Sequence, residues 1–276
     1  MTGLPQHFAW TGHEFEPTEP VEDSEILVAD SWRVRQGQVW GIEDHLHRFF
    51  TGLTAQAARL GEIGVTDPTA FDMALRHRLT LVAGQYPGTD LFPRISLETD
   101  GRAKRLILVA RRAPAARATT SLWIPNYTDP RIRPTVKGPD IDLMRRLVSE
   151  APTDDVILHD GTNVIETTTG TLLVWEKPTE LVFCQATQQL ASISAQRIAK
   201  FAKSQSLTVT HRPVTIQQIA TGEYPVWFAN TLHGISPVTT IGSVSGEKLI
   251  ADHPKTAHWQ AAWWSRFNEI PRAGLA

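Results

Sequence analysis

One lysine and one carboxylate in the middle of the chain stand out for the chemistry that they could do together. Lys137 lies in R-P-T-V-K-G-P-D, where few neighbours could solvate its amine or pair with it. Glu166 lies farther on, in V-I-E-T-T-T-G-T-L-L-V-W. A lysine amine forms a Schiff base with an aldehyde, and a fixed carboxylate keeps a pyridine nitrogen protonated so that the ring accepts electrons. The two residues therefore predict a site for an aldehyde cofactor.

Each of these residues also has an ordinary explanation. Lys137 could be a solvated surface charge, which is the interpretation that suffices for the other six lysines. Glu166 could be an exposed side chain beside a hairpin turn. If its strand is regular, alternation turns it to the same side as Val164, and a carboxylate on a half-buried strand needs a partner. The residue types and their spacing leave both alternatives open.

The surrounding pattern predicts the elements that must position these residues. An amphipathic helix follows Lys137 over residues 139–151, and Glu166 belongs to a strand over 164–167. Asp67-Pro68 is a capping residue followed by proline at a helix start, and Gly61 is a natural helix end. The other helices start near Glu43, Pro68 and Ala195, and a further helix at the end of the chain carries Trp259 and Trp263. The other predicted strands cover 25–29, 32–40 with a reversal at Gln36-Gly37, two segments joined by Asp100-Gly101, 121–124, 156–159, 171–176, 207–211 and 225–229.

The order of these elements predicts two domains of an α+β / α/β fold. Residues 113–120, A-P-A-A-R-A-T-T, are small, polar and contain proline, which is typical of a crossing between domains. We therefore expect a smaller N-terminal α+β domain over 1–116, with an extended arm over 1–24. A larger C-terminal domain should cover 117–276.

Composition limits the classes of partner. Lys+Arg 27 against Asp+Glu 29 leave a formal net charge of −2, so no electrostatic footprint for nucleic acid or for an anionic membrane exists. The single cysteine, Cys184, excludes an internal disulfide and fits a reducing compartment. The first residues lack an export signal, and no apolar run is long enough to span a membrane. We expect a cytoplasmic protein that acts on a small molecule.

A resemblance links the separate motifs. His45-x-x-Arg48 comes first, then Lys137, then E-x-x-x-G-x-L from Glu166, then Ile193-Ser194 before a helix, and last N-T-L-H-G-I-S-P-V from Asn230. This order resembles the class IV aminotransferases, the fold-type IV pyridoxal-phosphate enzymes, over residues 25 to 242. That family includes branched-chain and D-amino-acid aminotransferases and aminodeoxychorismate lyase. The resemblance implies a two-lobed enzyme that uses pyridoxal 5'-phosphate and has a mixed sheet in its larger C-terminal domain.

The resemblance also implies a role for each matching residue. Lys137 would be the catalytic Schiff-base lysine, and Glu166 would face the pyridine nitrogen. Arg48 would grip the cofactor phosphate, since a planar guanidinium suits a bidentate phosphate contact. The N–H groups at Ile193-Ser194 would open a helix onto the same phosphate, where an ordinary serine cap is the alternative. Thr231 would add a phosphate-binding hydroxyl.

The sequence departs from the family pattern at several positions. Ser192-Ile193-Ser194-Ala195 stands where Gly-Ile-Thr-Arg is usual, Thr171 stands where an asparagine is common, and Asp30-Ser31-Trp32 stands where Phe-Glu-Thr is often seen.

The resemblance therefore implies an aminotransferase for an amino acid. Aminodeoxychorismate lyase, which eliminates pyruvate and is favoured by Asn230, and a cofactor-binding protein without turnover are the alternatives. The family further implies a homodimer. His45 and His47 are two apart and point to different faces of a helix, so no metal site is predicted.

Overall fold

The chain divides into two compact units. The structure, a computed structural model, describes residues 3–21, 23–61, 65 and 67–269. The first unit contains the described residues up to Pro114, the segment Val136–Pro139, and residues 266–269. The second unit contains Ala115–Thr135 and Asp140–Ser265. The chain thus returns briefly to the first unit at Lys137, a step that the predicted domains over 1–116 and 117–276 do not include.

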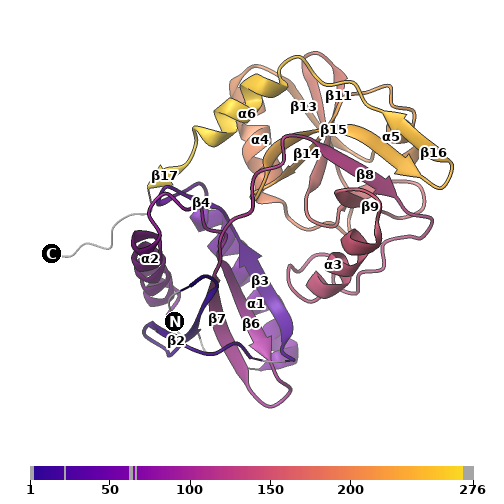
Figure 1. Cartoon of the computed structure of the whole chain (residues 1–276). Helices are drawn as coiled ribbons and strands as arrows, with labels where there is room; N and C mark the ends of the chain where they lie inside the picture. The colour runs from indigo at the N-terminus through magenta and orange to yellow at the C-terminus, as the bar shows by residue number, and fades with distance from the viewer. Residues whose placement is uncertain (1–2, 22, 62–64, 66, 270–276) are drawn as a thin grey trace. The chain divides into compact units, whose positions relative to one another are not determined.

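The first unit is an antiparallel sheet that carries two helices. Its main sheet has five strands in the order β2-β1-β7-β6-β3, and α1 and α2 lie along it (Figure 1). A second sheet has three short strands in the order β17-β5-β4. The bounds are β1 (Gln6–Trp10), β2 (Phe15–Pro17), β3 (Glu25–Ser31), β4 (Val34–Arg35), β5 (Gln38–Val39), α1 (Ile42–Leu60), α2 (Pro68–Gln85), β6 (Arg94–Thr99), β7 (Lys104–Ala110) and β17 (Asn268–Glu269).

The two helices begin and end where the local sequence predicts. Asp67 caps α2 by accepting from the N–H groups of Thr69 and Ala70, and Pro68 occupies the first turn. Gly61 ends α1 with a positive φ of 71°. Both helices bury one face in a core that includes Phe49, Phe71, Leu75, Leu79 and Leu108.

The second unit is a mixed sheet of nine strands. The order is β10-β9-β8-β15-β14-β11-β12-β13, with β16 paired to β15. The pairs β8–β9, β8–β15 and β12–β13 are parallel and the others are antiparallel. The bounds are β8 (Thr120–Ile124), α3 (Ile141–Glu150), β9 (Asp155–His159), β10 (Val164–Thr167), β11 (Thr171–Lys177), β12 (Glu180–Cys184), α4 (Ile193–Ser204), β13 (Thr208–Arg212), α5 (Ile216–Ala220), β14 (Val226–Asn230), β15 (Gly234–Ser243), β16 (Gly246–Leu249) and α6 (Thr256–Trp264).

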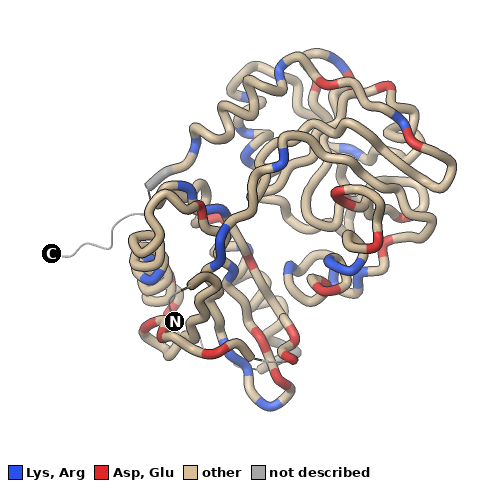
Figure 2. The backbone as a smooth tube through the Cα atoms, viewed as in Figure 1, with Lys and Arg blue, Asp and Glu red and all other residues tan. Residues whose placement is uncertain are grey.

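The prediction of an α+β / α/β fold with a mixed sheet in the larger unit is confirmed. Residues 1–24 were expected to form an extended arm; within the described residues, β1 and β2 of this segment form a hairpin at the edge of the first sheet. The strand β12 and the long strand β15 were not predicted. Charged residues of both signs are mixed along both units (Figure 2), and none of the described helices has the length and apolar character needed to cross a bilayer.

The segment that carries Lys137 is held against the edge strand β3. The N–H of Ala29 donates to the carbonyl of Lys137 at 2.7 Å. Gly138 has a φ of +139°, and a Cβ at this position would lie 2.7 Å from Cα of Val28 and 2.8 Å from N of Ala29. Only glycine fits this close approach. The backbone at Lys137 is therefore fixed by contacts with β3.

Gly138→Ala should destabilise the first unit by about 2–5 kcal/mol, because backbone strain and a clash with rigid main-chain atoms add together. Gly246 is the matched control, with a φ of +128° and no atom within 4 Å of an added Cβ. Gly246→Ala should show only the strain, about 1–2 kcal/mol. Urea unfolding of the two variants measures the difference. Equal losses would show that the contact with β3 does not constrain this segment.

Candidate functional site

Asp30 is the centre of a buried polar cluster in the first unit. Its carboxylate accepts from Nε and Nη2 of Arg48, both at 2.8 Å, and from Nδ1 of His45 at 2.8 Å. Asp30 is fully buried, and the Arg48 side chain is 16% exposed. His45 and Arg48 are three residues apart on α1, so both reach the same carboxylate at the end of β3. His47 is exposed, which confirms that the two histidines point to different faces.

The pKa values of Asp30 and His45 depend on burial and on the charges around them. Burial alone would raise the pKa of Asp30, but the charges and hydrogen bonds of Arg48 and His45 outweigh it and hold the pKa well below its usual range. Burial lowers the pKa of His45, and the charges of Arg48 and Lys137 lower it further against the opposing effect of Asp30. Because a carboxylate can only accept, the contact with Asp30 is donated by Nδ1–H of His45. Its Nε2 and the Nε1 of Trp32 are buried and find no hydrogen-bond partner among the described residues.

Arg48 is oriented by the same contacts. The bidentate pairing with Asp30 uses two of the five guanidinium donors. Lys137 belongs to the same unit, and its carbonyl is bound to Ala29, the neighbour of Asp30. The predicted residues Lys137 and Arg48 thus contact adjacent residues of β3. Lys137 binds Ala29 through its carbonyl, and Arg48 binds Asp30 through its side chain.

Glu166 is buried in the second unit and has partners there. Its Oε1 accepts from Nη1 of Arg131 at 2.7 Å and from the N–H of Leu190 at 3.0 Å. The expectation that a carboxylate on this strand needs a partner is confirmed, and the alternative of an exposed glutamate is wrong. A register shift between Val164 and Glu166 interrupts the pairing of β10 with β9. Simple alternation along the strand therefore could not have placed this side chain.

The sequence analysis missed Arg131 and Asp129. Arg131 binds Asp129 through Nε and Nη2 and binds Glu166 through Nη1. Burial lowers the pKa of Arg131, but the hydrogen bonds and charges of Asp129 and Glu166 outweigh it and raise the pKa above its ordinary value. The signal in the sequence was D-P-R-I-R-P, in which two arginines flank an isoleucine. Nothing in that pattern shows which arginine turns inward.

A second buried carboxylate fixes the turn after Glu166. Asp155 accepts from the hydroxyls of Thr168 and Thr169 and from the N–H of Val156. Burial raises the pKa of Asp155, and these hydrogen bonds and the nearby Arg117 offset only part of that effect. The turn that joins β10 to β11 is therefore held by hydroxyl groups rather than by an ion pair in direct contact.

Ser192, and not Ser194, caps the start of α4. Ser192 accepts from the N–H of Ala195, so Ser192 is the N-cap, and Ser194 lies inside the first turn. Ser194 and Ile193 are buried. The first N–H groups of a helix have no carbonyl partner within it and attract anions. Ile193 and Ser194 are the first two residues of this helix, the position at which such N–H groups lie.

Thr231 lies in a turn that Asn230 shapes. The Asn230 side chain accepts from the N–H groups of Leu232 and His233 at 3.1 and 2.7 Å, and its Nδ2 donates to the carbonyl of Thr169 at 3.2 Å. This amide ties the Thr231 turn to the turn that follows Glu166. In the same unit, the bond from Leu190 ties Glu166 to the segment before α4. The structure thus links the neighbourhoods of Glu166, Ser194 and Thr231 within one unit.

Taken separately, each unit holds groups that suit part of a phosphorylated pyridine aldehyde. The first unit offers an amine, a guanidinium group and two buried nitrogen atoms without a partner. The second unit offers a buried carboxylate, a helix start and a hydroxyl-bearing turn. These are the groups that an aldehyde, a pyridine nitrogen and a phosphate require.

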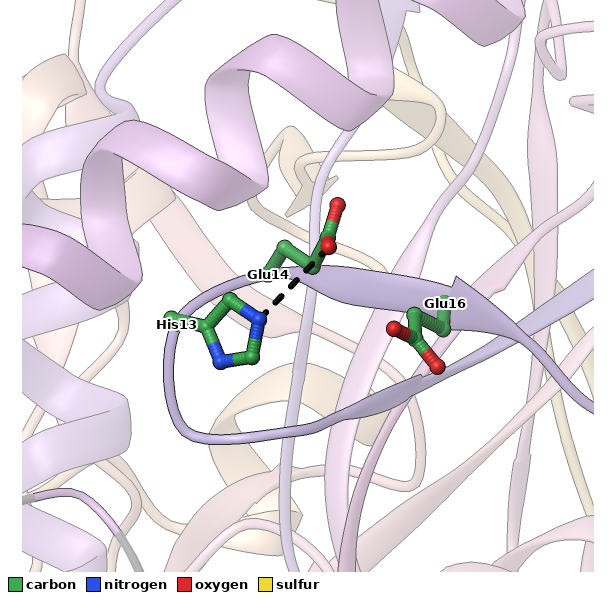
Figure 3. A group of neighbouring side chains, drawn as sticks. All are labelled: His13, Glu14 and Glu16. Atoms are coloured by element: carbon green, nitrogen blue, oxygen red, sulfur yellow. Dashed lines mark ion pairs between the residues drawn. The ribbon is translucent and has the colours of Figure 1, made fainter.

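One group of side chains on the first unit has the spacing of metal ligands. His13, Glu14 and Glu16 lie on the hairpin of β1 and β2 with ligand atoms within 4.8 Å of one another (Figure 3). All three are exposed, and His13 is 3.6 Å from Glu14. Exposed clusters of this kind are common without an ion, and no buried polar group accompanies this one, so we assign it no function.

Comparison with known proteins identifies the family. The sequence pattern of amino-transferase class IV matches residues 27–241, so the chain belongs to the class IV aminotransferases. No curated protein matches the sequence.

Solved structures share the fold. A hypothetical aminotransferase from Mycobacterium tuberculosis in its PLP-bound form superposes with a TM-score of 0.76 and 15% identity over 95% of this chain and 98% of that chain. A fold IV transaminase from Curtobacterium pusillum gives 0.73 and 16% over 95% and 98%. A branched-chain amino acid aminotransferase mutant from Thermobaculum terrenum gives 0.73 and 18% over 94% and 92%.

Asp30→Asn should destabilise the protein by about 3–5 kcal/mol near neutral pH, because it leaves Arg48 and His45 without their anionic partner. The folded-state pKa of Asp30 lies below the unfolded value of about 3.9, so its contribution is complete above that value and is lost as the pH falls toward the folded pKa. The difference between the two proteins should stay constant from about pH 5 to pH 8 and shrink below about pH 4.

Urea unfolding across this pH range measures the effect. Asp67→Asn is the control in the same unit, because asparagine caps a helix about as well as aspartate does, and its effect should stay within about 0.5 kcal/mol. A loss at Asp30 as small as that of the control would contradict the assigned role of the buried pair.

Proposed function

We propose that this protein is a pyridoxal-phosphate-dependent class IV aminotransferase that acts on an amino acid through a Schiff base at Lys137. The family match over residues 27–241 supports the class. The observation that carries the assignment of the lysine is the backbone of Lys137, bound to β3 next to the Asp30 cluster that orients Arg48. Members of the class IV family use pyridoxal phosphate, and the donor set described above fits it.

Each residue has a task that follows from its chemistry. Arg48, the N–H groups at Ile193 and Ser194, and the hydroxyl of Thr231 bind the phosphate. Glu166 keeps a proton on the ring nitrogen. The bound cofactor supplies an electron-accepting ring that stabilises negative charge at the α-carbon of the substrate. The amine of Lys137, once displaced by the substrate, removes the α-proton and returns a proton later in the reaction.

Transamination of an amino acid is the outcome that we favour over pyruvate elimination from aminodeoxychorismate. Asn230 pointed to the lyase branch in the sequence, but here its side chain is used to shape the Thr231 turn and to bind Thr169. The proposal includes a homodimer in the cytoplasm, as the family resemblance implies. A member that binds the cofactor without turnover is the third alternative, motivated by Ser192, Ala195 and Thr171.

Reduction of the purified protein with borohydride should attach the cofactor to Lys137, as identified by mass spectrometry of peptides. Lys137→Ala should abolish this attachment and leave the fold intact by circular dichroism, because only the side chain beyond Cβ is lost. Lys177→Ala is the control, since Lys177 is exposed and paired with Glu180. Attachment to a different lysine would overturn the assignment.

Glu166→Gln and Arg48→Lys should separate ring activation from phosphate binding. Glu166→Gln should retain cofactor and slow exchange of the substrate α-proton with solvent, because the amide cannot hold the ring proton by charge. Arg48→Lys keeps a cation beside Asp30 but loses the planar fork, so the cofactor affinity should fall roughly tenfold or more. Alanine at this position would leave Asp30 buried without its cation and is less informative.

Cofactor titration and proton exchange, followed by nuclear magnetic resonance with a panel of amino acids and with aminodeoxychorismate, measure both effects on one preparation. Normal exchange in cofactor-saturated Glu166→Gln would show that Glu166 is structural. Release of pyruvate from aminodeoxychorismate, without amino transfer to any acceptor, would favour the lyase.

A further inference from the structure

Arg131 divides its donors unequally between two buried carboxylates. Its Nε and Nη2 bind Asp129 at 3.0 and 2.7 Å, whereas only Nη1 binds Glu166, at 2.7 Å. The three side chains are 8%, 9% and 7% exposed for Arg131, Asp129 and Glu166. The two-point contact with Asp129 is the stronger geometry for a guanidinium group. The ion pair of Arg131 with Asp129 is therefore the stronger of the two.

This division matters because charges interact strongly where water is excluded. A full positive charge in contact with Glu166 would oppose a second positive charge on the far side of the same carboxylate. Removing all positive charge would leave Asp129 and Glu166 as two buried anions with no counter-ion from this side chain. The pairing of Arg131 with Asp129 avoids both extremes, and the single contact with Nη1 still fixes Oε1 of Glu166.

We propose that Asp129 and Arg131 are positioning residues for the ring nitrogen of the cofactor: Arg131 fixes the Glu166 carboxylate, and Asp129 offsets the charge of Arg131 so that Glu166 can hold a protonated ring. This inference rests on the proposed function and deepens it. It assigns Asp129 an electrostatic role, which Asp129 exerts through its ion pair with Arg131.

Arg131 also has a mechanical role that the test must separate from the electrostatic one. Its Nη2 contacts the carbonyl of Gln188 at 3.4 Å, two residues before the N–H that binds Glu166. Asp129 accepts from the backbone N–H of Arg131 at 3.1 Å, and asparagine can keep that bond through its amide oxygen. Asp129→Asn is therefore nearly isosteric. It removes the charge, and its amide nitrogen replaces the oxygen that accepts from Nη2 of Arg131, so that one hydrogen bond is lost as well.

The experiment loads the full-length protein with pyridoxal phosphate labelled with ¹⁵N in the ring. The ¹⁵N chemical shift is followed against pH, and cofactor affinity and unfolding of the cofactor-free protein are measured beside it. In Asp129→Asn the ring nitrogen should titrate about one to three pH units lower than in the wild type, because Arg131 is no longer offset. Exchange of the substrate α-proton should slow by tenfold or more.

Two further variants show whether charge is the cause. Asp142→Asn makes the same substitution in an ion pair with Arg145, where Asp142 is 77% exposed, and should change neither the titration nor the affinity. Asp129→Asn combined with Arg131→Gln removes both charges, so the ring nitrogen should titrate close to the wild-type value even though the affinity falls. A purely structural role predicts the opposite, a larger disturbance in the double variant.

Each outcome decides the matter. A wild-type protein that binds no cofactor overturns the proposed function and this inference with it. A wild-type protein that binds cofactor, with unchanged titration in Asp129→Asn, overturns the inference alone. If Asp129→Asn does not fold, the double variant has no unpaired charge from this pair, and a titration lower than the wild type in that protein overturns the inference.

Discussion

A carboxylate buried without a partner is too costly to keep ionised, and this constraint shapes the polar interior of both units. Asp30 satisfies it with Arg48 and His45, and Glu166 satisfies it with Arg131 and the N–H of Leu190. Asp155 satisfies it with two threonine hydroxyls and an amide instead. An arginine at hydrogen-bond distance favours the anion, whereas burial raises the pKa of Asp155, whose hydrogen bonds come from neutral donors and whose nearest contact with Arg117 is 3.9 Å. The groups that would face the cofactor are those held with a fixed charge.

The features that the sequence predicted are those that depend on neighbouring residues. Asp67-Pro68 and Gly61 act within one helical turn, so the start of α2 and the end of α1 were predicted where the structure has them. The strand over 164–167 is bounded by turns on both sides and was predicted at its observed bounds. The mixed sheet of the larger unit followed from the family resemblance and not from local patterns. The motifs of the family resemblance added the candidate residues, whose types are visible in the sequence. Periodicity alone would not have chosen Lys137 among the lysines.

The features that were missed depend on residues far apart in the chain. β1 joins the first sheet only because it pairs with β7, about a hundred positions later, and its own sequence has no clear alternation. The contact of Arg131 with Glu166 spans 35 positions, and nothing local distinguishes Arg131 from Arg133. The bulge before Glu166 likewise breaks the alternation on which the prediction of its side relied. Ion-pair partners and register are set by tertiary packing, which a single sequence does not display.

The departures from the family pattern at Ser192 and Thr171 have local physical explanations that preserve the candidate groups. Ser192 replaces a glycine and caps α4 with its own hydroxyl, which leaves the N–H groups of Ile193 and Ser194 at the helix start. Thr171 replaces an asparagine, yet the adjacent turn is fixed through Thr168 and Thr169 on Asp155 and through Asn230 on Thr169. Loss of an anchoring residue would loosen a site only if nothing else held the same turn. Here other side chains hold each turn, so these departures change how the site is supported and are compatible with an active enzyme.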